Sequence, residues 1–430
     1  MSPRVAVIGG GWAGCAAALS LAEAGVHTTL FEAGNILGGR ARAVQVKGHN
    51  LDNGQHILLG AYDQTLNLIA RVNPRNRDST DAILLRLPLA LDRPPDFSLV
   101  CPRLPAPFHL LVGLWRARGL GFFDKLAASR WVNSTLNGRE DMADTSVAQL
   151  IANQPKKVRA ALWEPLCIAA LNTRPEQASA KAFKQVLAAS FGKLRNHSDL
   201  LFPRVDLTCL FPAAASKRII ELKGEIRLQT RIKTLRADSH KIVLATLDSR
   251  IDFDRVIVAV APQHVAGICA EIAELKNICR IVESYRYEVI ATVYLQYSQD
   301  LRLPRPMLSL SGGPAQFVFD RGHTHGQPGL LAFVISAASS LLGHPQSEWV
   351  LQIQQQFSRI VASSAPLWIK AIVEKQATYL CSPNIAKPEN HTPHPLIFIA
   401  GDYTTGPYPA TLESATRSGV KSAQTLLNSL

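Results

Sequence analysis

Paired cysteines and long apolar runs are both missing from this chain of 430 residues. Its seven cysteines are odd in number, scattered and never spaced as CxxC. This argues against a disulfide framework or a zinc knuckle and favours a reducing compartment, so we expect no bound metal. No uninterrupted apolar run of about 18 residues occurs, and no transmembrane helix is predicted. The longest candidate, residues 107–123, carries Arg116 and Arg118 in its middle.

Targeting and nucleic-acid-binding patterns are missing as well. The first residues, MSPRVAVIGGG, lead directly into a strand-like run and a glycine turn, so we expect no secretory signal and a cytoplasmic location. The net charge of +13 is compatible with nucleic acid, with anionic lipid, or with solubility alone. Because no dense basic run with interleaved aromatic residues occurs, we expect no nucleic-acid partner. An anionic membrane surface stays open as a partner.

The N-terminal segment has the pattern of a dinucleotide-binding unit. A strand-like run (residues 4–8) precedes Gly9, Gly11 and Gly14, which form GxGxxG at the start of a predicted helix. The first glycine permits the turn, the second lets the backbone approach a pyrophosphate, and the third lets helix and strand pack closely. Glu32, at the end of the next predicted strand, is placed to accept a hydrogen bond from a ribose hydroxyl. The pattern therefore predicts a dinucleotide site.

A glycine-plus-arginine element favours FAD over NAD. It follows Glu32 closely and consists of Gly38, Gly39, Arg40 and Arg42. A guanidinium beside flexible glycines suits a second phosphate contact. The sequence contains no second strand–GxGxxG–helix unit for a nicotinamide nucleotide.

The C-terminal segment, another strand–turn–helix unit, indicates the same cofactor. Asp402 follows an apolar run and is placed to hold a polyol hydroxyl, although an ordinary turn aspartate is the alternative. The helix expected to begin near Thr411 and Leu412 would direct the partial positive charge of its N-terminus at a reduced flavin. Together with the N-terminal glycines, these features predict FAD.

Longer strings carry a family resemblance. GGGWAGCAAALSLAEAG and LFEAGNILGGRAR resemble the amine oxidase and phytoene desaturase superfamily of FAD proteins. WEPLCIAALNTRPEQASAKAF, GGPAQFVFDRG and GDYTTGPYPATLESATRSG resemble one branch, the squalene-associated FAD-dependent hydroxysqualene dehydroxylases. The resemblance spans the chain. It implies that hydroxysqualene, a long apolar isoprenoid, is reduced to squalene while FADH2 becomes FAD and water leaves. One departure is Gln263, which stands before His264 where we expect an aromatic residue.

The order of predicted elements and the resemblance together give an α/β fold. A Rossmann-like FAD-binding domain, glutathione-reductase-like and of the amine oxidase type, is expected from residues 1–80, 206–283 and 381–430. An α+β substrate-binding domain is expected to be inserted twice, from residues 81–205 and 284–380. The FAD domain is therefore predicted to be discontinuous.

The decapeptide LDNGQHILLG crowds polar side chains against an apolar run. In the superfamily this segment passes beside the flavin, which implies that Asn53, Gly54, Gln55 and His56 line the isoalloxazine and the reacting carbon. Loss of hydroxide from an allylic carbon needs a proton donor. His56 is the candidate because an unperturbed imidazole titrates near neutrality, and Asp52 could orient it. Alternatively, His56 caps the next element, and Asp52 forms a turn with Asn53.

Further candidates come from the predicted substrate domain. Glu164 and Asn172 are second-rank catalytic candidates, and Glu164 could equally lie on a helix surface. Asp320 and Arg321 could form a structural ion pair. The stretch 107–125 combines arginines and a lysine with leucines and phenylalanines, which would suit docking on a lipid surface. The alternative to docking is an ordinary amphipathic surface helix, which is common in soluble proteins. The same leucines and phenylalanines could line a substrate tunnel, although such a stripe is more often ordinary core.

Two other functions stay open at this point. A carotenoid (phytoene-type) desaturase, or another FAD-dependent oxidoreductase of the amine oxidase type, would use a similar site, and a desaturase would reverse the electron flow. A non-catalytic isoprenoid-binding escort protein is a remote alternative, because the FAD elements at both ends of the chain are intact. No pattern in the sequence names the electron donor.

Overall fold

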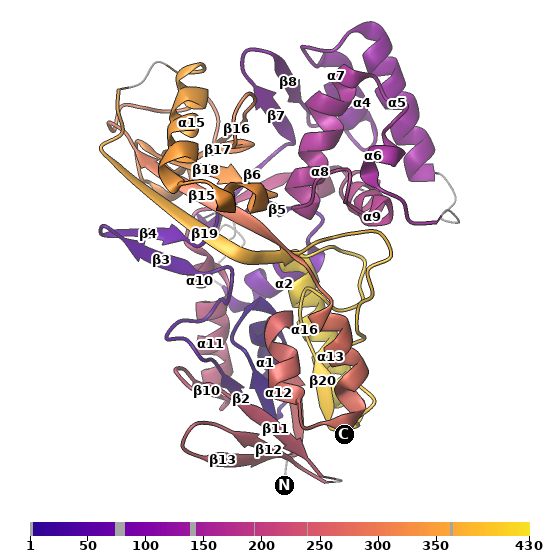
Figure 1. Cartoon of the computed structure of the whole chain (residues 1–430), viewed down its shortest axis with the longest axis vertical. Coiled ribbons are helices and arrows are strands. Elements are labelled where there is room, and N and C mark those ends of the chain that lie inside the picture. The colour runs from indigo at the N-terminus through magenta and orange to yellow at the C-terminus, as the bar shows by residue number, and fades with distance from the viewer. Residues whose placement is uncertain (1–2, 74–81, 138–142, 193, 239, 362–363) are drawn as a thin grey trace.

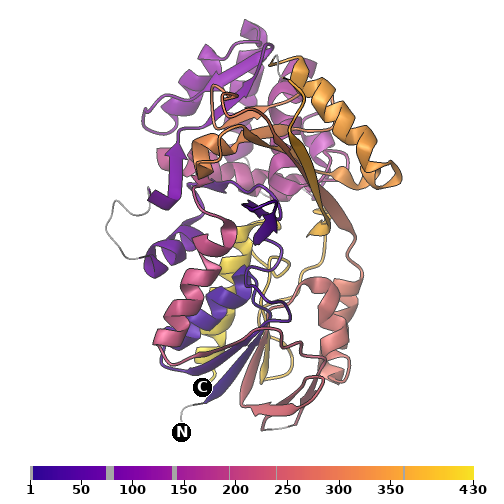
Figure 2. The ribbon, with the colours of Figure 1, turned by 90° about the vertical axis from the view of Figure 1, so that its left-hand side faces the viewer.

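The computed structural model describes residues 3–73, 82–137, 143–192, 194–238, 240–361 and 364–430. The molecule consists of two lobes stacked along its longest axis (Figure 1 and Figure 2). The lobe in which the chain begins and ends contains a parallel sheet, and we call it the nucleotide lobe. The other contains an antiparallel sheet beside a group of helices, and we call it the upper lobe.

A five-stranded parallel sheet of order β10-β2-β1-β14-β20 forms the centre of the nucleotide lobe. Its strands are β1 Arg4–Ile8, β2 His27–Phe31, β10 Glu225–Arg227, β14 Arg255–Val258 and β20 Ile397–Ile399. Most residues of the four strands other than β10 are buried, as expected for parallel strands covered on both faces. Segments far apart in the sequence share this sheet, which confirms the predicted α/β fold.

Two helices from opposite ends of the chain pack closely beside this sheet. They are α1 (Trp12–Glu23) and α16 (Leu412–Leu427). A Cβ added at Gly419 of α16 would lie only 2.2 Å from the Ala13 carbonyl oxygen of α1. This close crossing fixes the C-terminal helix against the helix that follows the first glycine turn. Helix α11 (Pro212–Glu221) also contacts α1, and α2 (Asp63–Val72) contacts α16.

The upper lobe is built on an antiparallel sheet of order β16-β17-β18-β15-β19. Its strands are β15 Tyr287–Gln296, β16 Met307–Ser309, β17 Phe317–Asp320, β18 Leu330–Ile335 and β19 Trp368–Tyr379. The long strands β15 and β19 extend toward the nucleotide lobe (Figure 1). Helix α15 (Gln346–Ser358) packs on the sheet through Trp349, Ile353 and Phe357. The short helix α14 (Arg321–His325) joins β17 to β18.

Most of the other described elements fall into three groups. The helical group of the upper lobe contains α4 Phe108–Arg116, α5 Phe122–Asn137, α6 Val147–Leu150, α7 Lys156–Val158, α8 Glu164–Leu171 and α9 Ala180–Phe191. Small antiparallel sheets are formed by β3 Ala43–Val46 with β4 His49–Asp52, by β5 Leu58–Leu59, β9 Leu200–Pro203 and β6 Leu84–Leu87, and by β7 Ala90–Arg93 with β8 Phe97–Val100. The nucleotide lobe also contains β11 Thr234–Ala237, β12 Ile242–Ala245, β13 Arg250–Phe253, α10 Leu207–Leu210, α12 Pro262–Cys269 and α13 Lys276–Glu283.

The strand positions are compatible with the predicted division of the chain. The parallel strands fall within residues 1–80, 206–283 and 381–430, and the strands of the five-stranded antiparallel sheet fall within residues 284–380. The exact boundaries stay predictions, and the one at residue 80 lies outside the described residues. None of the helices in the described part of the chain has both the length and the apolar character needed to span a bilayer.

Candidate flavin site and active site

The three glycines of the first turn have different surroundings. A Cβ at Gly14 would lie 1.8 Å from the Gly9 carbonyl oxygen, and a Cβ at Gly9, whose φ is +107°, would lie 2.6 Å from that of Ala259. A Cβ at Gly11 would meet nothing closer than the Gly39 Cα at 3.9 Å. The packing of the protein therefore requires Gly9 and Gly14, whereas Gly11 faces open space. Space beside the first turn of α1, where backbone N–H groups lack helical partners, suits a pyrophosphate.

The second glycine element lies directly against the first. The Gly38 N–H donates to the Gly10 carbonyl oxygen at 2.8 Å, and Gly38 forms a parallel bridge with Gly11. Both Gly38 and Gly39 have positive φ, at +118° and +60°, which explains why glycine occupies these positions. Two segments that are separate in the sequence thus come together at Gly10, Gly11, Gly38 and Gly39, which we call the glycine cradle.

Glu32 is fixed at the edge of this cradle. One carboxylate oxygen accepts from the Gly10 N–H and the other from the Gly34 N–H, both at 2.7 Å. Each carboxylate oxygen can accept a further hydrogen bond. The carboxylate is thereby oriented and keeps the capacity to hold a ribose hydroxyl, the role predicted for it.

Arg40 and Asp402 form an ion pair with each other. Arg40 Nη2 lies 2.7 Å from both Asp402 carboxylate oxygens, and Nη1 donates to the Ala377 carbonyl oxygen at 2.6 Å. The sequence suggested two independent cofactor contacts, a phosphate for Arg40 and a polyol hydroxyl for Asp402. In the structure the two residues bind each other, so a ligand group that bound either of them would share it with the other. Arg42 Nη1 donates to the Gly39 carbonyl oxygen at 2.5 Å.

Helix α16 begins beside this pair, where the sequence predicted it to begin. Thr411 is its N-cap, and the Thr411 hydroxyl accepts from the Ser414 N–H at 3.1 Å. The Ser414 hydroxyl donates to the backbone carbonyl oxygen of Asp402 at 3.2 Å. Leu412, the first residue of the helix, is half-buried. The positive end of the α16 dipole is therefore fixed next to Asp402.

Buried polar atoms without partners gather around the same pair. The hydroxyls of Tyr287, Tyr379 and Tyr403 have no hydrogen-bond partner among the described residues. Burial raises the pKa of each of these hydroxyls, and the charges of Arg40 and Asp402 act on all three. Such atoms are costly unless a ligand or water satisfies them. These tyrosines, which the sequence did not single out, fit the polar edge of a flavin nucleotide together with the glycine cradle.

Asn53 and Gly54 are fastened to the arginine element. The Asn53 N–H donates to the Arg42 carbonyl oxygen at 2.9 Å. Its side-chain amide donates to the Arg40 carbonyl oxygen at 3.0 Å and to the Glu374 carboxylate of β19 at 2.9 Å. Gly54 is buried. The structure therefore places the predicted flavin-lining turn immediately beside the glycine-plus-arginine element.

His56 lies next in the chain and points its ring back toward this turn. Its Nδ1 lies 2.8 Å from the Gly54 carbonyl oxygen, so Nδ1 must carry the hydrogen and Nε2 is left to exchange a proton. Burial, with the charge of Arg40, lowers the pKa of His56. The environment thus favours the neutral imidazole, and the expectation of an unperturbed pKa is wrong for His56.

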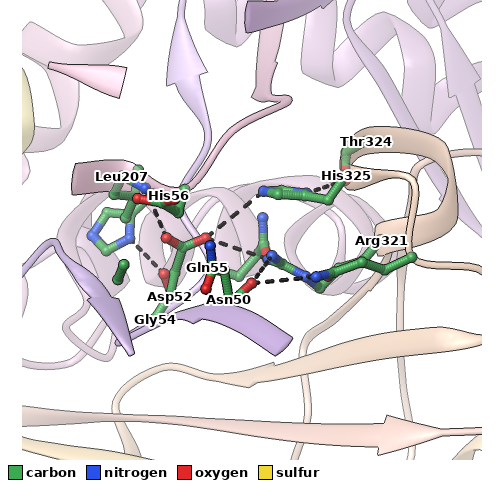
Figure 3. A network of polar contacts seen from close by, with 12 residues as sticks. Asn50, Asp52, Gly54, Gln55, His56, Leu207, Arg321, Thr324 and His325 are labelled. Carbon is green, nitrogen blue, oxygen red and sulfur yellow. Dashed lines mark hydrogen bonds and ion pairs between the residues drawn. The ribbon is translucent and has the colours of Figure 1, made fainter. Parts of the chain in front are cut away.

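Asp52 and Gln55 face Arg321, away from His56 (Figure 3). The buried Asp52 carboxylate accepts from the Leu207 N–H at 2.8 Å and from Arg321 Nη1 at 3.3 Å. The Gln55 amide oxygen accepts from the same Nη1 at 3.1 Å. No bond joins Asp52 to His56, so the idea that Asp52 orients the imidazole is wrong.

Arg321 does not pair with Asp320. The Asp320 carboxylate accepts from the backbone N–H groups of Gly322 and Leu303 and thereby caps α14. A carboxylate at an N-cap position satisfies helix N–H groups, which frees the following arginine to reach a partner from another segment. The ion pair suggested by the adjacent residues is replaced by the long-range pair with Asp52.

The remaining candidates lie outside this set of contacts. Glu164 begins α8 in the helical group and is half-buried, without a hydrogen bond or ion pair to another described residue. Asn172 ends the same helix in the left-handed conformation, and its amide bonds to the Thr378 hydroxyl and the Ala337 N–H. His264 is exposed on α12. The Asn172 side chain therefore joins the end of α8 to β19 and to the segment after β18, and no hydrogen bond or ion pair links Glu164 with His56.

Comparison with known proteins identifies the family. The family described as flavin containing amine oxidoreductase matches residues 12–427. The chain belongs to this family. It is an FAD-dependent oxidoreductase, and the glycine cradle, Glu32 and the polar edge around Asp402 fit that cofactor.

Relatives and solved structures match over the full length of this flavoprotein. Hydroxysqualene dehydroxylases of Rhodopseudomonas palustris and Zymomonas mobilis are 26% and 24% identical, over 99% and 98% of both chains. Phytoene and zeta-carotene desaturases also match, at 22–24% identity. A solved oxidoreductase from Methanosarcina mazei is similar in fold, with a TM-score of 0.76 and 16% identity over 98% of this chain and 100% of that chain.

Proposed function

We propose that this flavoprotein reduces hydroxysqualene to squalene with release of water. The observation that carries the proposal is the end-to-end similarity to hydroxysqualene dehydroxylases, which includes the segments that form the glycine cradle and the turn at Asn53 and Gly54. When bound, reduced FAD supplies hydride to a carbon centre. In the overall reaction the C–O bond of the alcohol breaks and a C–H bond forms with the hydride. The hydroxyl leaves with the proton as water.

The protein's part in this reaction is to position the substrate and to deliver the proton. The Nε2 of the protonated His56 ring is the group proposed to protonate the departing hydroxyl, because the Nδ1 hydrogen is bonded to the Gly54 carbonyl oxygen. Asn53 and Gln55, whose side-chain amides bind Glu374 and Arg321, hold the turn that presents His56 to the allylic carbon. Asp52 is assigned a supporting role through Arg321, and Glu164, from the helical group, is a second-rank candidate for the proton donor.

The decisive experiment is anaerobic incubation of the reduced enzyme with hydroxysqualene, followed by mass analysis of the products. The proposal expects squalene in amounts equal to the FAD that is reoxidised. A phytoene desaturase would instead reduce its oxidised flavin with phytoene and leave hydroxysqualene unchanged. A purified protein that lacks flavin absorbance when supplied with FAD would favour the escort alternative.

We also propose that the enzyme docks on anionic membranes through the surface formed by α4 and α5, which we call the α4–α5 surface. Large exposed side chains gather there: Phe108, Leu111, Trp115, Phe122 and Phe123. The Trp115 and Phe122 rings, and the Phe122 and Phe123 rings, contact each other with centroids 5.5 and 5.6 Å apart. An exposed contiguous aromatic cluster is unusual unless something covers it.

The charges around the α4–α5 surface suit acidic lipid headgroups. Residues 100–130 contain one acidic side chain, Asp124, and five lysines or arginines. The five are Arg103, Arg116, Arg118, Lys125 and Arg130. In both views of the ribbon, α4 and α5 lie at the end of the molecule opposite the chain termini (Figure 1 and Figure 2). Aromatic side chains within a basic surround match an anionic bilayer, where a long isoprenoid would dissolve.

A further inference from the structure

The segment Asn50–His56 is held from two opposite sides. On one side, Asn53 bonds to the backbone of the glycine-plus-arginine element and to Glu374. On the other side, the Arg321 guanidinium reaches Asn50, Asp52 and Gln55 (Figure 3). The proposed active-site turn therefore lies between a contact to the cofactor-binding element and a contact to the upper lobe.

The Arg321 guanidinium is fully buried and uses each of its nitrogens. Nε donates to the Gln327 amide oxygen at 2.6 Å, and Nη2 donates to the Asn50 carbonyl oxygen at 3.0 Å. Nη1 is shared between Asp52 at 3.3 Å and Gln55 at 3.1 Å. The carbon at its centre lies 5.9 Å from the centre of the Tyr294 ring. A planar group with fixed donors can bind several acceptors in one geometry, which a lysine ammonium cannot do.

The partners of Arg321 are themselves fixed. Asp52 also accepts from the Leu207 N–H, and its backbone carbonyl oxygen accepts from the Tyr294 hydroxyl at 2.9 Å. His325 Nε2 lies 3.9 Å from the same Asp52 oxygen that faces Arg321. Burial, and then the Arg321 charge, lowers the pKa of His325 to about 3, so the imidazole is neutral. Arg321 is thus the cation that pairs with Asp52.

A buried ion pair is a weak means of stabilising a fold. Taking both charges out of water costs much of what their attraction returns, and apolar replacements often serve stability equally well. Three of the four bonds from Arg321 go to neutral acceptors, two of which belong to the segment Asn50–His56. These contacts are those expected of a side chain that fixes the conformation of the segment Asn50–His56.

We propose that Arg321 is a positioning residue that fixes the segment Asn50–His56 and thereby holds His56 in line with the reacting carbon. It acts through Asn50, Asp52 and Gln55 and touches no reacting atom. The alignment with the reacting carbon rests on the proposed dehydroxylation, whereas the fixing of the segment Asn50–His56 does not. In geometric terms, loss of the guanidinium allows the turn to shift, and a displacement of about 1 Å costs about 10²-fold in rate.

The test compares Arg321→Lys and Arg321→Met with a matched control, Gln356→Ala. Gln356 is likewise buried, with three bonds to the backbone at Ser311 and Ala315, but it lies on α15, outside the contacts that hold the turn. The first measurement is hydrogen–deuterium exchange of a peptide covering residues 50–59, with and without FAD. Arg321→Met should speed exchange there by about tenfold or more, Arg321→Lys less, and Gln356→Ala not at all.

The second measurement is single-turnover reoxidation of the reduced flavin. With hydroxysqualene, Arg321→Met should be slower than the wild-type protein by about 10²-fold, and Arg321→Lys should recover part of that loss. With ferricyanide, a small acceptor that needs no alignment with His56, all variants should react at similar rates. Unchanged exchange in residues 50–59 of Arg321→Met, or equal slowing with both acceptors, would overturn the proposal.

The two readouts separate this inference from the proposed function. If the wild-type protein forms no squalene, the dehydroxylation is wrong, and the exchange data still decide whether Arg321 fixes the turn. If the wild-type protein forms squalene and Arg321→Met reacts at the wild-type rate with unchanged exchange, the dehydroxylation stands and the role of Arg321 does not.

Discussion

At the scale of single residues, the role of each glycine and the pKa of each titratable side chain depend on the atoms that surround it. Gly11 and Gly14 belong to one motif, but a Cβ would meet open space at the first and a carbonyl oxygen at the second. His56 would titrate near neutrality in water, and burial beside Arg40 lowers its pKa. The same residue type thus tolerates a side chain at one position and not at another, and the same imidazole has a different pKa in the protein than in water.

The contrast between the two glycines gives a paired prediction. Gly14→Ala should destabilise the FAD-free protein by about 1–3 kcal/mol, because the methyl group overlaps the Gly9 carbonyl oxygen. Gly11→Ala should change the unfolding free energy of that form by less than about 0.5 kcal/mol. It should raise the Kd for FAD by at least about tenfold, because the methyl group occupies the proposed pyrophosphate space. Urea denaturation of deflavinated protein and FAD titration measure the two effects, and equal behaviour of both variants would contradict the assignment.

The prediction for His56 concerns rate and pH. If the imidazolium donates the proton, reoxidation by hydroxysqualene should slow as the pH rises through the lowered pKa of His56, because only the protonated ring can donate. His56→Gln should retain FAD, slow the reaction by about 10²- to 10⁴-fold and lose this pH dependence. Stopped-flow absorbance between pH 5 and pH 8 records the flavin reoxidation. A wild-type rate in His56→Gln would assign the donor to another group or to water.

At the scale of elements, two pairs of helices lie at different ends of the molecule and have different proposed roles. The N-termini of α1 and α16 both lie at the cofactor-binding side of the nucleotide lobe, fixed by the glycine turn and by Thr411. Helices α4 and α5 present aromatic rings to the surface at the other end of the molecule. The pattern of the α4–α5 stretch was ambiguous between core and surface. Leu114 and Leu120 are in fact buried, while Phe122 and Phe123 are exposed.

The α4–α5 surface yields a membrane-binding prediction. Replacing Phe122 and Phe123 by Ser, or reversing Arg116 and Arg118 to Glu, should weaken binding to phosphatidylglycerol vesicles by about tenfold or more. Leu247→Ser is the control, because Leu247 is 81% exposed but lies between β12 and β13 in the nucleotide lobe. Vesicle flotation in low and high salt distinguishes the charge contribution, since exposed charges are screened over about 8 Å at physiological ionic strength. Flotation equal for all variants would exclude this surface.

At the scale of the whole molecule, the two lobes meet at buried polar contacts. Asp52 bonds to α10 through Leu207, to β15 through Tyr294 and to α14 through Arg321. Burial raises the pKa of Asp52 to about 6, against the opposing effect of Arg321. The ionisation of Asp52 therefore changes the strength of contacts between the two lobes and, with them, the stability of the whole fold.

The pH dependence of stability follows from this raised pKa. Between about pH 4 and pH 6 the folded protein holds a proton on Asp52 that the unfolded chain has released, so this carboxyl group favours folding at the lower pH and loses that effect as the pH rises. The side chain of Asp52→Asn cannot ionise. The difference between the unfolding free energies of the variant and the wild-type protein should therefore shift in favour of the variant from pH 4 to pH 6, and this difference should stay constant above pH 7. Arg321, His325 and Asp206 face the same group and are unchanged in the variant. A constant difference across the whole range would contradict the prediction.

The sequence by itself determined the features that depend on local backbone conformation and on periodicity. Gly9, Gly11 and Gly14 between a strand and a helix, Glu32 at the end of the next strand, and a helix beginning at Thr411 are readable because turns and helix starts demand particular residue types nearby in the chain. The α/β fold followed from the same patterns, since strand and helix periods differ.

Only the tertiary structure decided which side chains meet and how far burial alters them. Arg40 and Asp402 are 362 residues apart, and Asp52 and Arg321 are 269 apart, so no local pattern could pair them. The unpartnered tyrosines around Asp402 are unremarkable in the sequence. The pKa of His56 depends on burial and on the neighbouring Arg40 charge. Ion pairing and desolvation act over a few ångströms of space, and that distance is set when the whole chain folds.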